Sequence, residues 1–256
     1  MKSLRFVCLT AEVVAALLAA GQQTVTLPAT GSPGLDHYRA SRIAIYLNDY
    51  GELARYGAAD AALKAPAPGE NRVVFFGDSI TDMWNLAESF PSKPYVNRGI
   101  SGQTTSQMLV RFRQDVINLR PKVVVILAGT NDIAGNSGPI ADSDIEANFA
   151  SLAELARAHN IHVVVASILP VHNYTPESQE LFAQRSPERI LALNIWLRNY
   201  CSANVTTYLD YFSSMVDGKG WLKRDLANDG LHPNKVGYAV MVPLAQAAID
   251  KALKKP

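Results

Sequence analysis

Short apolar runs rich in β-branched residues recur along this chain, and segments with helical spacing separate them. Residues 73–76 form one such run, and residues 123–127 form another that no polar residue interrupts. Strands that are apolar on both faces are typical of parallel sheets covered by helices on each side. This alternation predicts an α/β domain with a doubly wound parallel sheet.

Five segments are predicted as strands of that sheet, and right-handed crossovers then fix most of its topology. The segments are residues 72–76, 95–97, 123–127, 162–167 and 205–209. The chain has 256 residues, which suits one sizeable domain with a buried core. No second domain is indicated.

The first 21 residues differ in composition from the rest of the chain. Lys2 and Arg5 precede an apolar stretch at 6–20, and small residues follow it, which is the layout of a secretory signal peptide. Glu12 interrupts the stretch, which is also shorter than a membrane span, so stable membrane insertion is not expected. We therefore predict a secreted or periplasmic protein; the alternative is an N-terminal segment of a cytosolic protein.

Residues 22–34 are polar, contain Pro28, Gly31 and Pro33, and are predicted to be a linker. Apolar residues at helical spacing then predict a helical extension over 35–63, packed on the outside of a single domain that spans 35–256. Residues 168–186 are predicted to be a long loop. His172 within that loop is expected to be exposed to solvent.

A serine follows the first strand, in the sequence Gly-Asp-Ser at 77–79. A strand that stops at a glycine places the next side chains at its C-terminal edge, where ligands bind in open α/β sheets. Ser79 is therefore positioned as a nucleophile, but a serine alone proves little because most serines are caps, turns or surface residues. The prediction depends on its partners.

Those partners come from three other segments, each expected at the same edge of the sheet. His232 can take the proton of the Ser79 hydroxyl, and Asp229, three residues earlier, can orient the imidazole. The backbone N–H groups of Ser79 and Gly102, with the side-chain amide of Asn131, can form an oxyanion hole. Gly102 has no side chain, so its N–H can approach a substrate closely.

Each of these residues also has a purely structural explanation. Asp229 and the glycine after it form a good turn, His232 can introduce the last helix, and Gly102 can serve turn geometry alone. Their joint occurrence in this order, just after strands or in the terminal loop and all at the same edge of the sheet, is what favours a catalytic site.

Four blocks together resemble the SGNH, or GDSL-type, serine hydrolases, in the branch of platelet-activating-factor acetylhydrolase and lysophospholipase L1-like esterases. The blocks lie at residues 77–80, 97–104, 129–132 and 229–233. The resemblance implies a flavodoxin-like three-layer α/β/α fold, the roles given above for the five site residues, no metal and no organic cofactor. One departure is Gln103, where members of the family often have aspartate.

The chain is therefore predicted to be a carboxylic ester hydrolase that uses a Ser-His-Asp triad and an acyl-enzyme, with short-chain acyl esters, above all acetyl esters, as substrates. A lysophospholipase or thioesterase acting on longer chains is the alternative within this class. An acyltransferase and a non-catalytic carbohydrate-binding module are alternatives from other classes.

The formal net charge of +1 gives no indication of nucleic acid as a partner, so a small-molecule or carbohydrate ester is expected instead. The oligomeric state stays open. Two cysteines occur, Cys8 in the predicted signal peptide and Cys201 in a segment with helical spacing. Cys201 is expected to pack in the core. The pair His159 and His162 is not expected to bind a metal.

Overall fold

The computed structural model describes residues 27–254. The predicted signal peptide at 1–21 and the first five residues of the predicted linker lie outside the described residues. The strands are β1 Val73–Gly77, β2 Tyr95–Gly99, β3 Val123–Leu127, β4 His162–Ala166 and β5 Thr207–Leu209. The helices are α2 Pro33–Asp49, α3 Ala54–Ala62, α4 Ser79–Asp82, α5 Leu86–Ser89, α6 Thr105–Asp115, η1 Ile117–Leu119, α7 Thr130–Ala134, α8 Asp142–Ala158, α9 Ser178–Ala183, α10 Pro187–Ala203, α11 Phe212–Met215, η2 Arg224–Leu226 and α12 Lys235–Leu253.

The strands form one parallel sheet in the order β2-β1-β3-β4-β5. This order belongs to the flavodoxin-like arrangement, in which the chain adds β2 on one side of β1 and every later strand on the other. Ligands bind in such sheets beside the strand where the direction of growth reverses, at the carboxyl ends of the strands. The predicted fold class and the number of strands are therefore confirmed.

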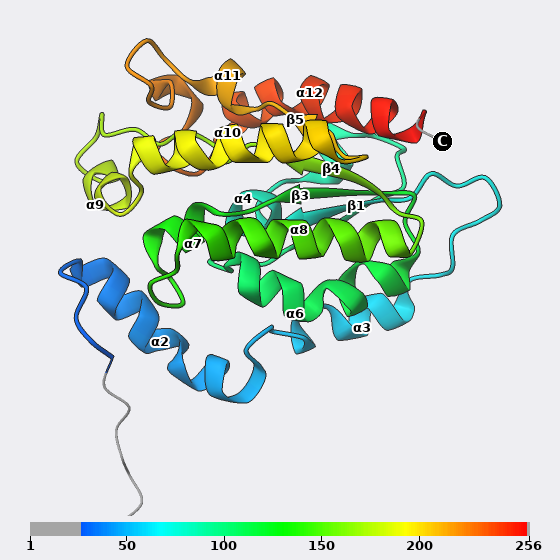
Figure 1. Cartoon of the computed structure of the whole chain (residues 1–256), viewed down its shortest axis with the longest axis horizontal. Coiled ribbons are helices and arrows are strands. Elements are labelled where there is room, and N and C mark those ends of the chain that lie inside the picture. Colours follow the sequence, from blue (N-terminus) through cyan, green and yellow to red (C-terminus); the bar gives the residue numbers. More distant parts are fainter. Residues whose placement is uncertain (1–26, 255–256) are drawn as a thin grey trace, which may run out of the picture.

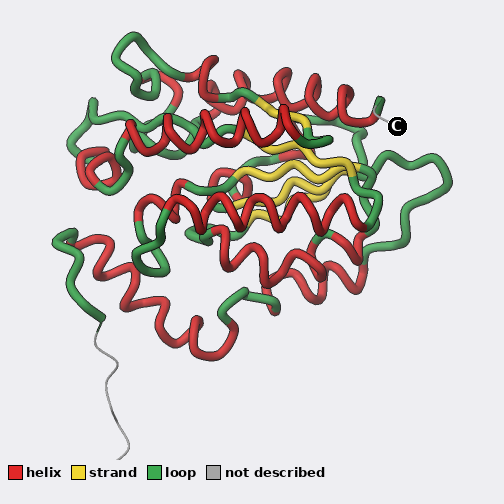
Figure 2. Tube along the Cα trace, in the orientation of Figure 1, coloured by secondary structure: helices red, strands yellow, loops and turns green. Residues whose placement is uncertain are grey.

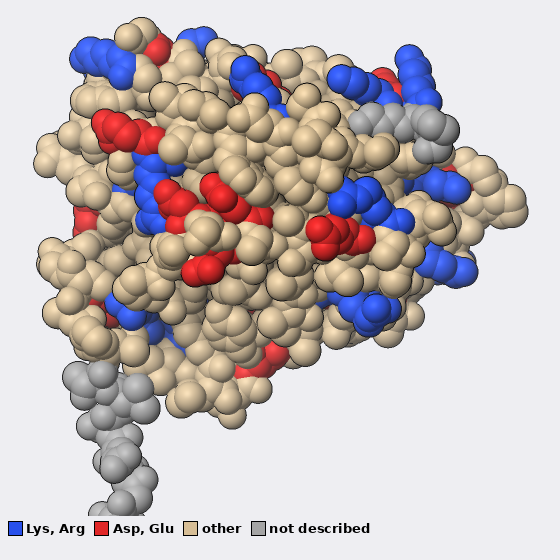
Figure 3. Space-filling model, viewed as in Figure 1, with Lys and Arg blue, Asp and Glu red and all other residues tan. Residues whose placement is uncertain are grey.

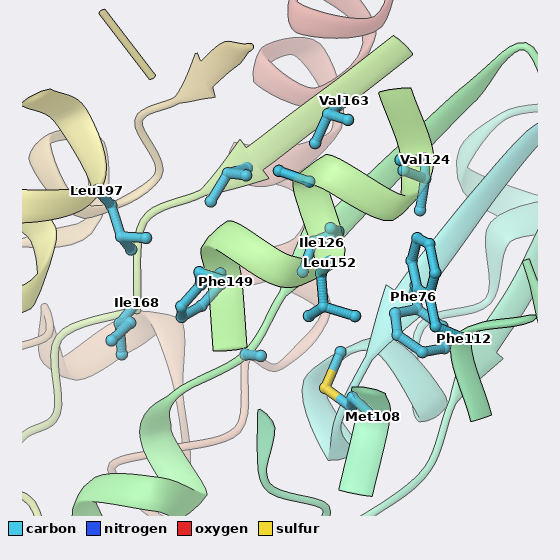
Figure 4. Packing of buried hydrophobic residues seen from close by; sticks show 14 of the residues in the cluster. Phe76, Met108, Phe112, Val124, Ile126, Phe149, Leu152, Val163, Ile168 and Leu197 are labelled. Atoms are coloured by element: carbon cyan, nitrogen blue, oxygen red, sulfur yellow. The ribbon is translucent and has the colours of Figure 1, made fainter. Parts of the chain in front are cut away.

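Two hydrophobic cores cover the two faces of the sheet, because alternate residues of each strand point to opposite sides. Val74 and Phe76 of β1 pack with α6, α8 and α10, and the Phe76 ring meets that of Phe112 edge to face (Figures 1 and 4). Val73 and Phe75 pack with α12 and the segment after α4. β1 and β3 are buried on both faces, which explains why their apolar runs are unbroken.

The N-terminal extension differs from its prediction in two ways. It consists of two helices, since a turn at Gly51 and Glu52, with Glu52 at a φ of 54°, separates α2 from α3. The helical region also begins at Pro33, two residues inside the predicted linker, because proline suits the first turn of a helix.

The segment predicted as a long loop at 168–186 contains the short helix α9. His172, expected to be exposed, is fully buried: its Nδ1 accepts a hydrogen bond from the backbone N–H of Tyr174, and its Nε2 lies 3.2 Å from the carbonyl oxygen of Ala227. The imidazole thus joins this segment to the loop that precedes α12. Cys201 is buried in the core, as predicted.

Candidate active site

Three predicted residues form a continuous chain of side-chain contacts at the carboxyl edge of the sheet. The Ser79 hydroxyl lies 2.9 Å from Nε2 of His232, and Nδ1 of His232 lies 2.7 Å from a carboxylate oxygen of Asp229. With Nδ1–H donating to Asp229, Nε2 is left as the acceptor that faces the serine. The arrangement matches that of a nucleophile, a general base and the group that orients the base.

The short loop before α12 builds the Asp229–His232 pair from local contacts. One carboxylate oxygen of Asp229 accepts hydrogen bonds from the backbone N–H groups of Leu231 and His232, at 3.0 and 2.8 Å. Gly230, at a φ of 83°, makes the turn in a conformation that only glycine adopts readily. Burial acts to raise the pKa of Asp229, but the hydrogen bonds from His232 and Leu231 outweigh it and lower that pKa well below its usual value.

Ser79 is the first residue of the four-residue helix α4, directly after β1. Asp78 caps this helix, since its side chain accepts a hydrogen bond from the N–H of Ile80 at 3.0 Å. A side chain at Gly77 would meet the Thr81 hydroxyl at 2.2 Å and the Leu127 carbonyl oxygen at 2.6 Å, so only glycine fits between the strand end and this helix. The tight turn holds the Ser79 side chain at the floor of a cleft.

The predicted oxyanion donors lie around the same cleft. Within residues 27–254, neither the backbone N–H of Ser79 nor that of Gly102 has a hydrogen-bond acceptor in the protein. Gly102 adopts a φ of 81°, and a Cβ there would lie 1.9 Å from the hydroxyl of Tyr38. Both the backbone conformation and the neighbouring side chain therefore require glycine at this position.

The cleft has a volume of about 440 Å³, and α2 and α9 contribute to its walls. Of the predicted residues, Ser79, His232, Gly102 and Asn131 line it directly. The wall also carries groups that the sequence analysis did not single out: Gly34, Leu35, Tyr38 and Arg42 from α2, and Glu180, Leu181, Gln184 and Arg185 from the α9 segment. The extension thus forms part of the site besides packing outside the domain.

A carboxylate joins the two walls. Glu180 accepts hydrogen bonds from the Ser32 hydroxyl and the backbone N–H of Gly34, both at 2.6 Å, and the Gln184 amide donates to Ser32 at 2.7 Å. We call these contacts between Glu180, Gln184 and the start of α2 the α2–α9 clasp. Figure 1 shows the start of α2 and α9 on the same side of the molecule as α7, which carries Asn131.

Gln103, the departure from the family pattern, is buried, and its side-chain amide is hydrogen-bonded at both ends. Its amide nitrogen donates to the Gly51 carbonyl oxygen at 3.0 Å, and its amide oxygen accepts from Arg111 at 2.6 Å. An aspartate could accept from Arg111 but could not donate to the turn between α2 and α3. Gln103 therefore connects the loop of Gly102 to the N-terminal extension.

Two buried carboxyl groups flank the strand ends. Burial raises the pKa of Asp78 and of Asp132 to about 6 in each case, although hydrogen bonds from Ile80 and from Thr105 act in the opposite direction. Asp132 holds the start of α6, because it accepts from the backbone N–H and the hydroxyl of Thr105. Asp78 has one oxygen with no hydrogen-bond partner in residues 27–254.

Residues 27–254 hold no group of three or more His, Cys, Asp or Glu side chains that could bind a metal ion, and His159 and His162 form none. In the same residues, none of the helices combines the length and apolar character needed to cross a membrane. The face that α8 and α10 present carries both Lys and Arg and Asp and Glu side chains (Figure 3).

Residues 75–240, well over half of the chain, match the model of the GDSL-like lipase/acylhydrolase family. The chain belongs to this family. The match spans all four sequence blocks, so the predicted recognition is confirmed. The predicted enzyme class, a carboxylic ester hydrolase, is confirmed by this family of lipases and acylhydrolases and by the esterase relatives.

Curated relatives align over part of their length. Platelet-activating factor acetylhydrolase IB subunit alpha1 of Pongo abelii is 29% identical over 177 residues, which cover 66% of this chain and 71% of the relative. Esterase TesA of Pseudomonas aeruginosa is 30% identical over 138 residues, 54% of this chain and 60% of the relative. The chain spans half of the uncharacterized Bacillus subtilis lipoprotein YqeF, at 29% identity over 122 residues and 40% of this chain.

Solved structures of the same fold cover more of the chain. A GDSL-like lipase from Bacteroides thetaiotaomicron is 40% identical, with a TM-score of 0.74, over 80% of this chain and 100% of that one. An acetylxylan esterase from Geobacillus stearothermophilus shares the fold alone. It is 20% identical, with a TM-score of 0.57, over 73% of this chain and 96% of that one.

Proposed function

We propose that this protein is a serine esterase that hydrolyses short-chain acyl esters, with acetyl as the preferred acyl group, through the nucleophile Ser79. The observation that carries the proposal is the continuous contact from Ser79 through His232 to Asp229 at the floor of an open cleft. The names of the acetylhydrolase relatives support an acetyl group.

In the proposed reaction, the Ser79 oxygen attacks the ester carbonyl while Nε2 of His232 takes its proton. Asp229 holds the imidazole in the correct tautomer and stabilises its protonated form. The N–H groups of Ser79 and Gly102, and the amide of Asn131, stabilise the negative oxygen of the tetrahedral intermediate. His232 then protonates the departing alcohol, and water releases the acyl group by the same steps in reverse.

The walls of the cleft support a small acyl group and a hydrophilic alcohol. Arg42, Glu180 and Gln184 bring charged and amide groups to the cleft, which favours hydrogen-bonding alcohols such as sugars over long alkyl chains. A sugar hydroxyl can add hydrogen bonds to those that Glu180 and Gln184 make within the protein, whereas an alkyl chain cannot.

The test is hydrolysis of p-nitrophenyl esters from acetate to palmitate by the wild-type protein and Ser79→Ala, followed by acetylated sugars. We expect the highest kcat/KM at acetate or butyrate and no turnover by the variant. A maximum at long chains would instead support a lysophospholipase or thioesterase. Transfer of the acyl group to an added alcohol in preference to water would support an acyltransferase.

A complete lack of Ser79-dependent turnover, together with no labelling of Ser79 by a fluorophosphonate, would overturn the esterase and favour a non-catalytic binding module. The labelling experiment does not depend on the choice of ester, because the probe reacts with any activated serine.

We also propose that the protein acts outside the cytoplasm, as a secreted or periplasmic enzyme. The layout of residues 1–21 supports this location, and one curated relative is a lipoprotein. N-terminal sequencing of the protein exported by a suitable host tests it. Recovery of uncleaved protein in the cytoplasm alone would contradict the proposal.

A further inference from the structure

An arginine with no carboxylate partner is buried at the cleft. Arg185, at the end of the α9 segment, is 3% exposed and lines the same cavity as Ser79 and Asn131. No carboxylate lies within ion-pair distance of it in the part of the chain that the structure describes. Burying an unpaired cation opposes folding, so the position of Arg185 calls for a compensating role.

The guanidinium group binds two consecutive residues at the start of α7. Its Nε donates to the Thr130 hydroxyl at 3.1 Å, and its Nη2 donates to the side-chain oxygen of Asn131 at 3.2 Å. Its remaining nitrogen donates to the Leu181 carbonyl oxygen at 3.2 Å and to the Gln184 side chain at 3.1 Å. A planar group with donors in a fixed fork can make all these contacts at once, and a lysine ammonium cannot.

These contacts determine which way the Asn131 amide faces. Arg185 can only donate, so the Asn131 atom that faces it must be the amide oxygen. The carbonyl oxygen of Gln103 can only accept, so the Asn131 atom at 3.1 Å from it must be the nitrogen. Asn131 is thus held from both ends, with one N–H bound to Gln103 and the second N–H available.

We infer that Arg185 is a positioning residue that orients the Asn131 amide as an oxyanion donor and joins it to the α9 wall of the cleft. This inference rests on the proposed function. Without Arg185, the amide oxygen of Asn131 loses its donor, and rotation of the amide would present an oxygen to the developing negative charge. The α9 wall would also lose its direct link to α7.

The test compares Arg185→Met with Arg189→Met, a control four residues along on α10. Arg189 also binds α7, through the Ile133 carbonyl oxygen, and pairs with Asp142, but it does not line the cleft with Ser79. We expect Arg185→Met to lower kcat at least about ten-fold. The largest decrease expected is that caused by complete loss of one oxyanion donor, which lowers kcat by roughly 10²–10³. KM should change little, and Arg189→Met should keep the wild-type kcat.

Arg185→Lys separates position from charge. Because lysine keeps the charge but not the fork, its kcat should stay close to that of Arg185→Met. A double-mutant cycle with Asn131→Ala then asks whether the two residues act together. In the Asn131→Ala background, replacing Arg185 should have almost no further effect on kcat or on the rate at which a fluorophosphonate labels Ser79.

Additive effects in the cycle, full recovery of kcat by lysine, or an effect on KM alone would each overturn the inference. Circular dichroism and the thermal midpoint identify a variant that fails to fold, and Arg185→Lys then carries the test. The wild-type protein separates the two proposals: if it neither hydrolyses esters nor labels at Ser79, the esterase itself fails, whereas an active wild type with a fully active Arg185→Met refutes only the role of Arg185.

Discussion

The two sides of the cleft are built in different ways. On the side of His232, the contacts are local: Asp229 and His232 are three residues apart, and the loop between them supplies the hydrogen bonds that hold the carboxylate. On the side of Asn131, contacts join distant segments: Asn131 and Arg185 are 54 positions apart in the sequence, and Gly34 and Glu180 are 146 positions apart. The first side is specified by one loop, and the second depends on the whole fold.

The largest expected effect tests the local side. Asp229→Asn should keep the carbonyl oxygen that accepts from the backbone of Leu231 and His232, so the loop should keep its shape. It should lower kcat by about 10³–10⁴, because His232 is no longer held in the tautomer that accepts the Ser79 proton. Steady-state kinetics on a p-nitrophenyl ester measure the effect.

Asn228→Asp is the control for Asp229→Asn: it changes the charge of the same loop at the neighbouring position and should keep kcat within a few-fold of wild type. A kcat of Asp229→Asn within ten-fold of wild type would mean that the local pair does not drive catalysis, and the contrast between the two sides would not hold.

A smaller effect concerns the pH dependence of stability. The pKa of Asp78 is raised from 3.8 to about 6 in the folded protein, so the folded state binds more protons than the unfolded state between these values. Stability therefore falls as the pH rises from about 4 to 6, and the loss is complete above that pKa. From pH 5 to pH 7, Asp78 should lower the free energy of unfolding by about 1 kcal/mol.

Asp78→Asn should remove this part of the decrease, measured by urea unfolding at both pH values. Asp132 contributes a decrease of the same sign, so some pH dependence should persist in the variant. Glu154→Gln, on the exposed side of α8, is the control. An identical decrease in the wild type and in Asp78→Asn would show that burial does not shift this carboxyl group.

The smallest expected effect tests the side built from distant segments. Glu180→Ala removes the acceptor of the α2–α9 clasp, and Glu177→Ala changes an exposed residue of the same segment that makes no side-chain hydrogen bond within residues 27–254. Since water can replace the lost contacts, we expect KM to rise roughly three-fold with kcat nearly unchanged. Equal KM values for the two variants would mean that the clasp does not shape the cleft.

The difference between the two sides also explains what the sequence could predict. The sheet and the five site residues could be inferred because each depends on a short pattern: an apolar run, a glycine at a strand end, or a turn before a helix. Ser79 meets His232 because β1 ends at the carboxyl edge of the sheet, where the loop before α12 also lies. The catalytic roles themselves stay predictions until the variants are measured.

Arg185, Glu180 and His172 could not be placed in this way. Their surroundings come from segments far apart in the sequence, and an arginine or a histidine in a long polar stretch is usually exposed to solvent. In the structure, Ser186 is the N-cap of α10 and the proline at 187 opens it, which ends that stretch. Neither residue indicates which side chains of the stretch turn inward.

Gln103 shows one consequence for the boundaries of the working enzyme. The family match begins at residue 75. Gln103 lies within the match, but its side chain binds the turn at Gly51, which lies outside the match. Figure 2 shows the helices of this N-terminal region beside the core. A protein shortened to the matched residues would retain Ser79, Asp229 and His232 but lose Tyr38 and the other α2 residues of the cleft. Anyone who transplants this catalytic unit to another host protein must therefore move the N-terminal helices with it.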